Sequence, residues 1–436
     1  MPIPSLGIFS QRLILSRRTD PPQAEPLRRR KDQKSKIENN SMPIGTPFHS
    51  RTSALCISHN WRDWSGYLVA SSYAVLHDQE YHAIRNSAAL IDVSPLYKYD
   101  ISGHDALKFV NRVITRDVAK CALHQAMYTC LCDEEGKVIQ DGTVFRLGES
   151  RFRFHLAEPS LRWFQMNATG MKVNIEDVSE QVAAVALQGP TSREILRQVS
   201  EGDIEQLRFF RFTFANVGRV QAIISRTGYT GDLGFEIWVP AAQAEELWDR
   251  LTNVGKPYGI TPAGMLALDM ARLEAGFILL EVDYTSAEKA LIASQKYSPF
   301  EIGLGWTVSL DKENFVGRRA LLEEKQRGSA RQLIGLEIDW DDYERLYQEV
   351  GLAAQLPTAA WRGGVPVYRD NRQVGQATTG GWSPTIKKYV ALATVQSKFS
   401  EPGTELFMEM TVEYVRKKVR ATVVKPPFFD PPRKRA

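Results

Sequence analysis

A segment at residues 226–237 carries residue types and spacing suited to holding a flat ligand. It reads Arg-Thr-Gly-Tyr-Thr-Gly-Asp-Leu-Gly-Phe-Glu-Ile, with glycines at Gly228, Gly231 and Gly234. Glycine lets another backbone or a flat ligand approach closely, and the ring of Tyr229 offers a stacking face. The carboxylate of Glu236 can accept paired hydrogen bonds from the N–H groups of a heterocycle. Considered alone, the segment is better explained as a glycine-rich hairpin with a surface glutamate.

Other titratable residues have an ordinary structural explanation beside a chemical one. Asp117 follows a predicted helix, where a carboxylate is often a cap or a solvated charge. Asp269 and Arg272 have the i, i+3 spacing of an ion pair on one helix. The Cys-x-Cys pair at 130–132 has no His/Cys cluster beside it in the sequence, so we expect buried thiols and no metal site.

Several common catalytic motifs are absent from the sequence. There is no Gly-x-Ser-x-Gly, no phosphate-binding Gly-x-x-x-x-Gly-Lys-Ser/Thr and no Rossmann glycine fingerprint. Covalent serine catalysis, nucleotide hydrolysis and hydride transfer on a dinucleotide fold are therefore unsupported.

The elements that must position these residues alternate between strands and helices. Residues 182–187 are typical of a buried strand, and the run after Phe235 alternates in polarity as a strand that carries one inward carboxylate. Amphipathic helices are predicted at 192–199 and 241–254. Short mixed strands with helical connections indicate an α+β fold rather than one doubly wound parallel sheet.

The character of the chain changes at the polar linker 326–331. Beyond it, strands separated by Gly and Pro turns predict a small barrel or sandwich. We therefore expect an α+β region at 42–325, a C-terminal barrel-like domain at 326–436, and a helical insertion in that domain at 339–361.

Charge is concentrated at the N-terminal end. Residues 1–41 hold nine Lys/Arg and four Asp/Glu, and the remainder holds 46 basic and 47 acidic residues, a net charge of −1. A nearly neutral body argues against a nucleic-acid partner. No apolar run approaches the ~18–20 residues that span a bilayer, so no membrane association is expected. The four cysteines fit a reducing compartment, and we expect a cytoplasmic location.

The basic leader at 1–41 has two interpretations. Its arginines and the late first acidic residue, Asp20, resemble a transit peptide or a disordered basic arm, which would direct the protein to the mitochondrial matrix. Alternatively, Met42 is the true start and the upstream stretch is non-native, which is the interpretation we favour.

Nine short motifs occur in a fixed order along the chain. They are Asp92-Val-Ser94, Ser102-Gly103-x-Asp105-Ala106, Ile114-Thr-Arg-Asp117-Val, Ala186-Leu-Gln-Gly-Pro190, Thr227-Gly-Tyr-Thr-Gly231, Gly234-Phe-Glu-Ile237, Arg272-Leu-Glu-Ala-Gly276, Gly303-Leu-Gly-Trp306 and Ser383-Pro-Thr-x-Lys387. Read together, they closely resemble the aminomethyltransferase (glycine cleavage T-protein) superfamily of tetrahydrofolate-dependent one-carbon transferases. The resemblance covers roughly residues 60–428.

The resemblance implies a three-lobed cloverleaf, with two interleaved α+β lobes, a C-terminal β-barrel-like lobe and tetrahydrofolate in a central channel. It implies that Asp117 lies beside the folate nitrogens and stabilises positive charge as bonds to carbon break. It also implies that Glu236 grips the pterin through paired hydrogen bonds. Tyr229 would line the pterin pocket, and Tyr128 would form a wall of it.

The chain departs from the family pattern at positions that would face the donor. Leu268 stands where the pattern has an arginine that contacts the ligand, and Asp133, a further candidate cofactor contact, stands where it has asparagine. Within Leu280-Glu-Val-Asp283, only the final aspartate follows the pattern. These departures point to a paralogue rather than to the glycine cleavage component itself.

Three functions remain open at this point. The first is an enzyme, a folate-dependent aminomethyl- or methyltransferase that uses a small donor, with or without a carrier protein. Among such enzymes, a demethylase that passes methyl from an O-, S- or N-methyl donor to tetrahydrofolate fits at least as well as an aminomethyltransferase. The second is a non-catalytic folate-binding regulatory protein, against which the presence of Asp117 argues. The third is one lobe of a flavin-dependent amine-demethylating system.

Overall fold

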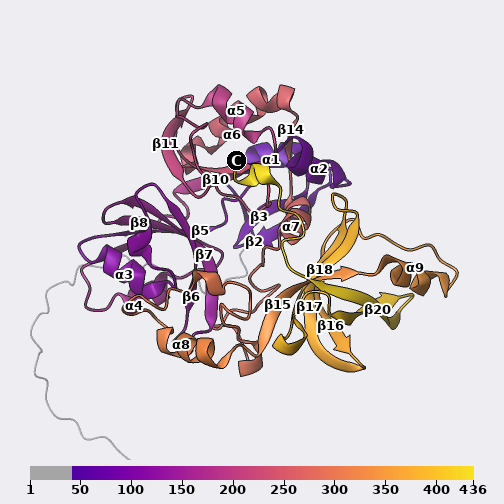
Figure 1. Ribbon diagram of the computed structural model, residues 1–436. Coiled ribbons are helices and arrows are strands. Elements are labelled where there is room, and N and C mark those ends of the chain that lie inside the picture. Colours follow the sequence, from indigo (N-terminus) through magenta and orange to yellow (C-terminus); the bar gives the residue numbers. More distant parts are fainter. Residues whose placement is uncertain (1–41) are drawn as a thin grey trace, which may run out of the picture. The chain divides into compact units, whose positions relative to one another are not determined.

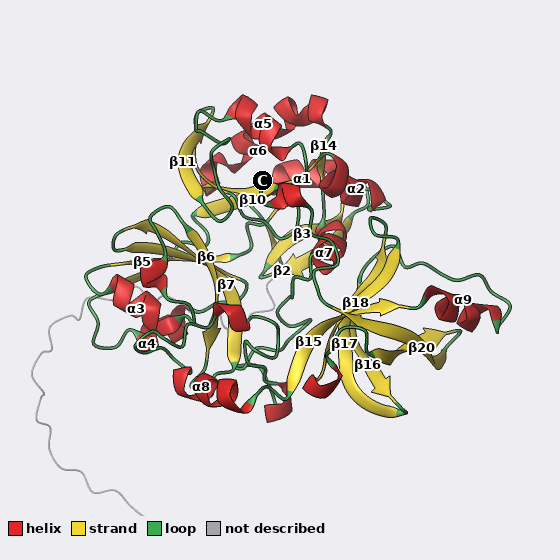
Figure 2. Ribbon diagram, in the orientation of Figure 1, coloured by secondary structure: helices red, strands yellow, loops and turns green. Residues whose placement is uncertain are grey.

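The computed structural model describes residues 42–436, and the expectations for the leader at 1–41 lie outside the described residues. Residues 42–436 form one compact unit by their contacts. No described helix is both long and apolar enough to cross a membrane. The α-helices of this unit are α1 (His49–Leu55), α2 (Asp78–Asn86), α3 (Ala106–Val113), α4 (Leu161–Asn167), α5 (Ser192–Val199), α6 (Ala244–Gly255), α7 (Met265–Glu274), α8 (Arg318–Arg327) and α9 (Trp340–Gln348) (Figure 2).

A six-stranded sheet carries the glycine-rich segment (Figure 1). In spatial order its strands are β11 (Phe212–Val217), β12 (Val220–Ser225), β13 (Gly234–Pro240), β10 (Val182–Gln188), β4 (Ala88–Asp92) and β14 (Ile260–Pro262). The neighbours pair antiparallel except β14, which runs parallel to β4. The buried strand that the sequence predicted at 182–187 is therefore central to this sheet.

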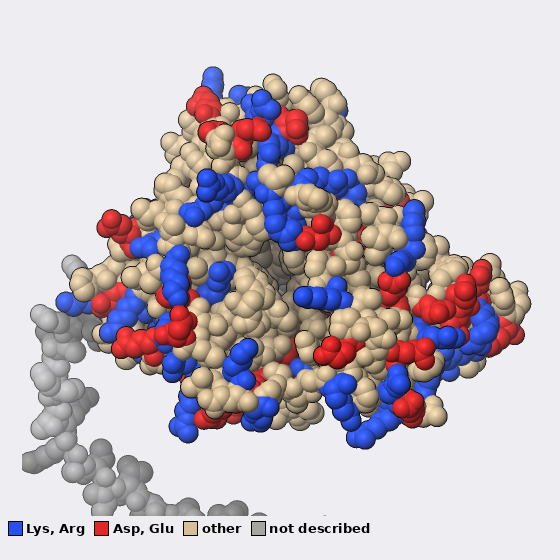
Figure 3. Space-filling model, viewed as in Figure 1, with Lys and Arg blue, Asp and Glu red and all other residues tan. Residues whose placement is uncertain are grey.

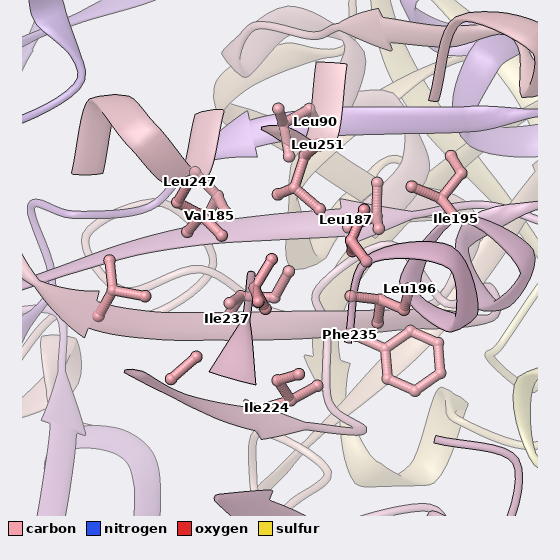
Figure 4. Close-up of a cluster of buried hydrophobic side chains, with 14 of the residues drawn as sticks. Leu90, Val185, Leu187, Ile195, Leu196, Ile224, Phe235, Ile237, Leu247 and Leu251 are labelled. Carbon is pink, nitrogen blue, oxygen red and sulfur yellow. The ribbon is translucent and has the colours of Figure 1, made fainter. Parts of the chain in front are cut away.

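Alternation along β13 decides which way Glu236 points. Phe235 and Ile237 pack in an apolar cluster with leucines of α5 and α6, including Leu196 and Leu247 (Figure 4). Trp238 belongs to a different cluster, which contains side chains of α2, α7 and the C-terminal strands. Because successive side chains of a strand point to opposite faces, Glu236 shares the inner face with Trp238.

The body also contains a five-stranded sheet. In sequence, all of its strands lie between β4 and β10 of the six-stranded sheet. In spatial order its strands are β6 (Ala126–Cys132), β7 (Val138–Gly148), β8 (Arg151–Leu156), β5 (Tyr97–Ser102) and β9 (Asn174–Asp177). The chain leaves the first sheet after β4 and returns to it at β10, which pairs with β4. The two sheets are therefore interleaved in sequence, as predicted.

The C-terminal strands close into a barrel. Around it they run β15 (Arg331–Ile338), β18 (Lys388–Gln396), β17 (Arg372–Ser383), β16 (Trp361–Arg369), β19 (Glu405–Val412) and β20 (Val415–Val424). Its apolar interior also receives Tyr343 and Leu346 of α9. The α+β fold with a C-terminal barrel is thus confirmed. Closure leaves the barrel no unpaired strand edge.

A small sheet and a shared cluster complete the body. The small sheet has the order β1 (Ile44–Gly45), β3 (Tyr67–Ser72), β2 (Asn60–Trp64). The cluster that holds Trp238 also takes in Phe145 of the second sheet, Val69 of the small sheet, and Val390 and Leu392 of the barrel. Apolar packing therefore joins the lobes directly beneath the inner face of β13.

Candidate functional site

Glu236 is a carboxylate held in place with most of its hydrogen-bonding capacity unused. The hydroxyl of Thr227 donates to its Oε2, and Thr227 in turn lies 2.7 Å from the hydroxyl of Ser225. No ion pair within residues 42–436 involves Glu236. Burial raises the pKa of Glu236, and the Thr227 hydroxyl offsets part of that rise. A carboxylate in this setting gains from a ligand that brings N–H donors.

The glycines before Glu236 serve packing within the protein. A Cβ on Gly228 or Gly234 would lie 2.1 or 2.3 Å from the side chain of Gln188, whose amide donates to the carbonyl oxygens of Thr227 and Phe235. The sequence suggested that these glycines make room for a backbone or a flat ligand. The structure corrects this, because the neighbour of Gly228 and Gly234 is the buried Gln188 side chain.

Tyr229 leaves this turn toward α7 and the segment after it. Its ring stacks on Phe277 with a centroid separation of 5.6 Å and an interplanar angle of 24°, and its hydroxyl donates to the carbonyl of Ile278. Burial raises the pKa of Tyr229, so the hydroxyl stays protonated. The charges of Arg272 and Asp141 also act on the pKa of this hydroxyl, and they do so in opposite directions.

Asp117 caps a short 3₁₀ turn, Val118–Lys120. Its Oδ1 accepts from the amide of Ala119 at 3.1 Å, and its own amide donates to the hydroxyl of Ser309 at 3.2 Å. Its Oδ2 lies 3.6 Å from the ammonium of Lys120. The side chain is 14% exposed, so the sequence-based cap explanation holds while one oxygen remains available to a ligand.

Lys312 holds the loop that leads into Asp117. Its buried ammonium donates to the carbonyl oxygens of Asn111 (2.6 Å), Ile114 and Arg116 (2.8 Å). Burial lowers the pKa of Lys312 to about 7, and the charge of Asp117 opposes that fall. Three carbonyl acceptors match the three N–H donors of an ammonium group, so these contacts favour the charged form.

Tyr128 links a partly buried carboxylate to a surface aromatic. Its hydroxyl donates to Asp141 Oδ2 at 2.6 Å, and the hydroxyl of Tyr284 donates to the other oxygen of Asp141. Its ring stacks on Trp306 at 6.1 Å, and the Arg116 guanidinium lies 5.3 Å from that indole. Burial raises the pKa of Asp141, and the two tyrosine hydroxyls offset part of the rise.

Asp133 is held by contacts with Lys137 and Lys296. It sits in the β6–β7 turn, where its Oδ1 accepts from the amide of Lys137 at 2.8 Å and its Oδ2 lies 3.4 Å from the ammonium of Lys296. Within the described residues, no hydrogen bond or ion pair joins Asp133 to Asp117, Tyr128, Tyr229 or Glu236.

A network of charged side chains lies on and around α7. The Arg272 guanidinium is fully buried and contacts Asp283 at 2.7 Å and Asp269 at 3.3 Å, which confirms the ion pair expected from their spacing. Asp269 is also reached by Arg62 at 3.6 Å and by Arg362 at 2.6 Å. Figure 3 shows a hollow in the middle of the molecular face, where Figure 2 shows β2 and β3.

Sequence reasoning assigned no role to Asp141, Tyr284, Lys312, Arg62 or Arg362. One signal was available for Asp141, a single acid in an otherwise strand-like run from Val138 to Phe145. The others join the site through contacts between residues far apart in the chain, which local patterns do not report.

Comparison with known proteins places the chain among one-carbon transferases. Residues 53–312 match the family described as GCVT N-terminal domain, and residues 331–430 match the glycine cleavage T-protein C-terminal barrel domain.

Three similar proteins are named aminomethyltransferase. The one from Caldanaerobacter subterraneus subsp. tengcongensis is 34% identical over 84% of this chain and 91% of its own length. Those from Halalkalibacterium halodurans (34%) and Bacillus subtilis (33%) each align with 84% of this chain, and with 93% and 94% of their own lengths.

Among solved structures, the glycine cleavage system aminomethyltransferase T from Bartonella henselae superposes with a TM-score of 0.75. It is 24% identical and covers 89% of this chain and 99% of its own, so this likeness bears on the fold alone.

Proposed function

We propose roles for two carboxylates of a chain that belongs to the glycine cleavage T-protein family. Glu236 and Asp117 hold the two ends of the reacting half of tetrahydrofolate. Family membership makes the protein a folate-dependent one-carbon transferase with tetrahydrofolate as its carrier. The assignment of individual residues and of the donor is our proposal.

The observation that carries the residue assignment is the unpaired state of Glu236. It lies on the inner face of β13 with a single hydroxyl donor, from Thr227, and without a cation in the described residues. A pterin presents adjacent N–H groups that a carboxylate accepts as a pair. Tyr229 closes this end with a ring that Phe277 and Ile278 hold in place.

Asp117 would act at the other end. Its carboxylate is fixed by the Ala119 amide and by the loop that Lys312 clamps, so its position costs little reorganisation during the reaction. There it orients the ligand and stabilises positive charge as a bond to the transferred carbon breaks. Tetrahydrofolate itself supplies the one-carbon chemistry. Tyr128 forms a wall of the same space, and the contact of Asp133 with the ligand stays a prediction.

For the donor, we favour a small methylated compound over an aminomethyl group on a carrier protein. Leu268 and Leu280 replace the polar residues of the family pattern, and both side chains are buried in apolar clusters. These two positions therefore offer no polar contact to a donor. The carrier protein and the cytoplasmic location stay predictions.

Product identity tests this proposal. The protein is incubated with tetrahydrofolate and a panel of O-, S- and N-methyl donors, or with aminomethylated lipoyl carrier, and the folate product is identified by mass spectrometry. We expect 5-methyltetrahydrofolate from a methyl donor. Formation of 5,10-methylenetetrahydrofolate from the lipoyl carrier alone would instead establish the aminomethyltransferase.

The Asp117→Asn variant serves to test catalysis within the same assay. It should lower turnover by about 10²–10⁴-fold while tetrahydrofolate affinity changes little. Asp311→Asn is the matched control, because Asp311 also contacts Lys120, at 2.9 Å, but is 69% exposed. No turnover with any donor, together with intact folate binding, would favour the non-catalytic folate-binding protein.

A further inference from the structure

Three guanidinium groups from three different elements converge on one carboxylate. Arg272 of α7 lies 3.3 Å from Asp269, Arg62 of β2 lies 3.6 Å from it, and Arg362 of β16 contacts both of its oxygens at 2.6 Å. Asp269 itself is 5% exposed. This cluster therefore joins the small sheet, α7 and the barrel at one point.

One of the three arginines is fully used within the protein. The Arg272 side chain has no exposed surface, and its nitrogens donate to Asp269, Asp283, the Phe277 carbonyl and the Thr379 hydroxyl. Its charge is balanced by Asp283. That leaves Arg62 and Arg362 to share Asp269, so the cluster holds three positive and two negative groups and carries an excess of one positive charge.

The other two arginines keep unused donors. Arg62 donates from Nε to the Ser71 hydroxyl at 3.2 Å and reaches Asp269 with Nη1 alone. Arg362 contacts Asp269 with a single nitrogen, Nη2. Each guanidinium has five N–H groups. The remaining donors make no hydrogen bond within the described residues, and the side chains are 27% and 36% exposed.

The two guanidinium groups are close enough to repel each other. Burial lowers the pKa of Arg62, and the charge of Arg362 lowers it further. The strand that carries Arg362 is irregular next to it, with a register shift between Arg362 and Val365 and a φ of +148° at Gly363. This bulge re-aims the strand where Arg362 meets Asp269. Holding two like charges together costs free energy, which a bound anion would recover.

The location connects this pair with the candidate folate site. The Arg272 guanidinium, which contacts Asp269, donates to the carbonyl of Phe277, and the ring of Phe277 stacks on Tyr229. Leu268, beside Asp269 in the chain, stands where the family pattern has arginine, and its side chain is buried in an apolar cluster. Arg62 of β2 and Arg362 of β16 therefore bring positive charge to Asp269 of α7.

We propose that Arg62 and Arg362 form a carboxylate-binding subsite beside the candidate folate site. Guanidinium groups with free parallel donors bind carboxylates in a bidentate manner. Two ligands could bring the group, namely the glutamate tail of tetrahydrofolate or a methyl donor that is itself a carboxylic acid. The proposal rests on the proposed function for the identity of these ligands.

Binding titrations distinguish the two sources. Tetrahydrofolate and tetrahydropteroylamide, which has a neutral amide in place of the glutamate, are titrated calorimetrically into the wild type, Arg62→Gln, Arg362→Gln and the double variant. If the folate tail is the ligand, tetrahydrofolate affinity falls at least tenfold in the double variant and tetrahydropteroylamide affinity does not change. Arg62→Lys, which keeps the charge, should restore part of the loss. Arg319→Gln, at a 93% exposed arginine on α8, is the control.

If the donor brings the carboxylate, both folates bind the variants normally. The probes are then N,N-dimethylglycine and N,N-dimethylethanolamine, which differ in the carboxylate, titrated with and without tetrahydrofolate. The wild type should bind the acid and the double variant should not. The subsite is overturned if neither tetrahydrofolate nor the acid depends on the arginines in variants whose melting temperature is preserved. Failure of the wild type to bind either folate would contradict the proposed function instead, and the acid probe would still decide the subsite.

Discussion

At the scale of single residues, the site contrasts two carboxylates in different surroundings. Asp117 is fixed by a backbone amide and lies near Lys120, whereas within residues 42–436 Glu236 has a single hydroxyl partner and no cation. A carboxylate without a cation is costly to ionise when it is buried. Glu236 is therefore the group whose protonation should respond most to a ligand that brings N–H donors.

The first prediction concerns Glu236 and pH. Burial raises its folded-state pKa above the ordinary value, so the ionised form that accepts the pterin N–H groups is lost as pH falls through that raised value. Tetrahydrofolate affinity should drop over that window. Glu236→Ala should weaken binding by more than about tenfold, or ~1.4 kcal/mol, at neutral pH. Titration calorimetry across pH measures both effects.

The same raised pKa makes the stability of the unliganded fold depend on pH in the opposite direction from folate binding. Its contribution to stability is present at low pH, below the unfolded-state pKa, and is lost as pH rises through the folded-state value. Glu236→Gln should therefore abolish the pH dependence that Glu236 adds to folate binding without lowering the melting temperature at pH 7. A binding curve that keeps the same pH dependence in this variant would remove Glu236 from the pterin contact.

At the scale of elements, the turn between β12 and β13 sets the direction of both Tyr229 and Glu236. Gln188 of β10 fills the space above Gly228 and Gly234, and its amide bonds to carbonyl oxygens at both ends of the turn. Gly231 adopts a φ of +72°, and a Cβ there would lie 2.4 Å from the Cβ of Ala275. The glycines are thus required by packing against β10 and α7.

The second prediction tests that requirement. Gly231→Ala should destabilise the protein by about 2–4 kcal/mol, from the left-handed backbone and the clash together. Gly170→Ala is a matched control, because Gly170 has a φ of +80° and no atom within 4 Å of the added Cβ. Its cost should be the backbone contribution alone, about 1–2 kcal/mol. Equal losses of unfolding free energy in urea titrations would show that Ala275 yields without cost.

At the scale of the whole molecule, Glu274 at the end of α7 ties distant parts together. Its buried carboxylate accepts from Tyr81 and Arg85 of α2 and from Ser383 of the barrel. Its carbonyl accepts from the amides of Phe428 and Phe429 near the C-terminus. One side chain therefore ties α2, α7 and the barrel to one another, and α7 and the barrel carry Asp269 and Arg362 of the arginine cluster.

The third prediction follows from this position. Glu274→Gln keeps the volume but leaves the Arg85 guanidinium with Asp232, 3.3 Å away, as its remaining carboxylate partner, and should lower the free energy of unfolding by about 3–5 kcal/mol. Glu323→Gln, at a 59% exposed residue paired with Arg319, should change it by less than about 1 kcal/mol. A loss below about 1 kcal/mol for Glu274→Gln would show that the contacts of this carboxylate add little to the docking of the barrel.

Local patterns in the sequence determined much of this protein by themselves. The alternation after Phe235 placed Glu236 on an inner face, because strand side chains alternate whatever lies around them. The ordered motifs identified the family, and the Gly/Pro-punctuated strands indicated the C-terminal barrel. Such features depend on neighbours in the chain, so the sequence reports them directly.

Only the tertiary structure decided which distant side chains meet. Arg62, Asp269 and Arg362 come from three elements far apart in the chain, as do Tyr128 and Tyr284 around their shared carboxylate. It also showed that glycines which suggested room for a ligand accommodate a buried glutamine instead. These meetings depend on how lobes pack through shared apolar clusters, and no periodicity within one element encodes that arrangement.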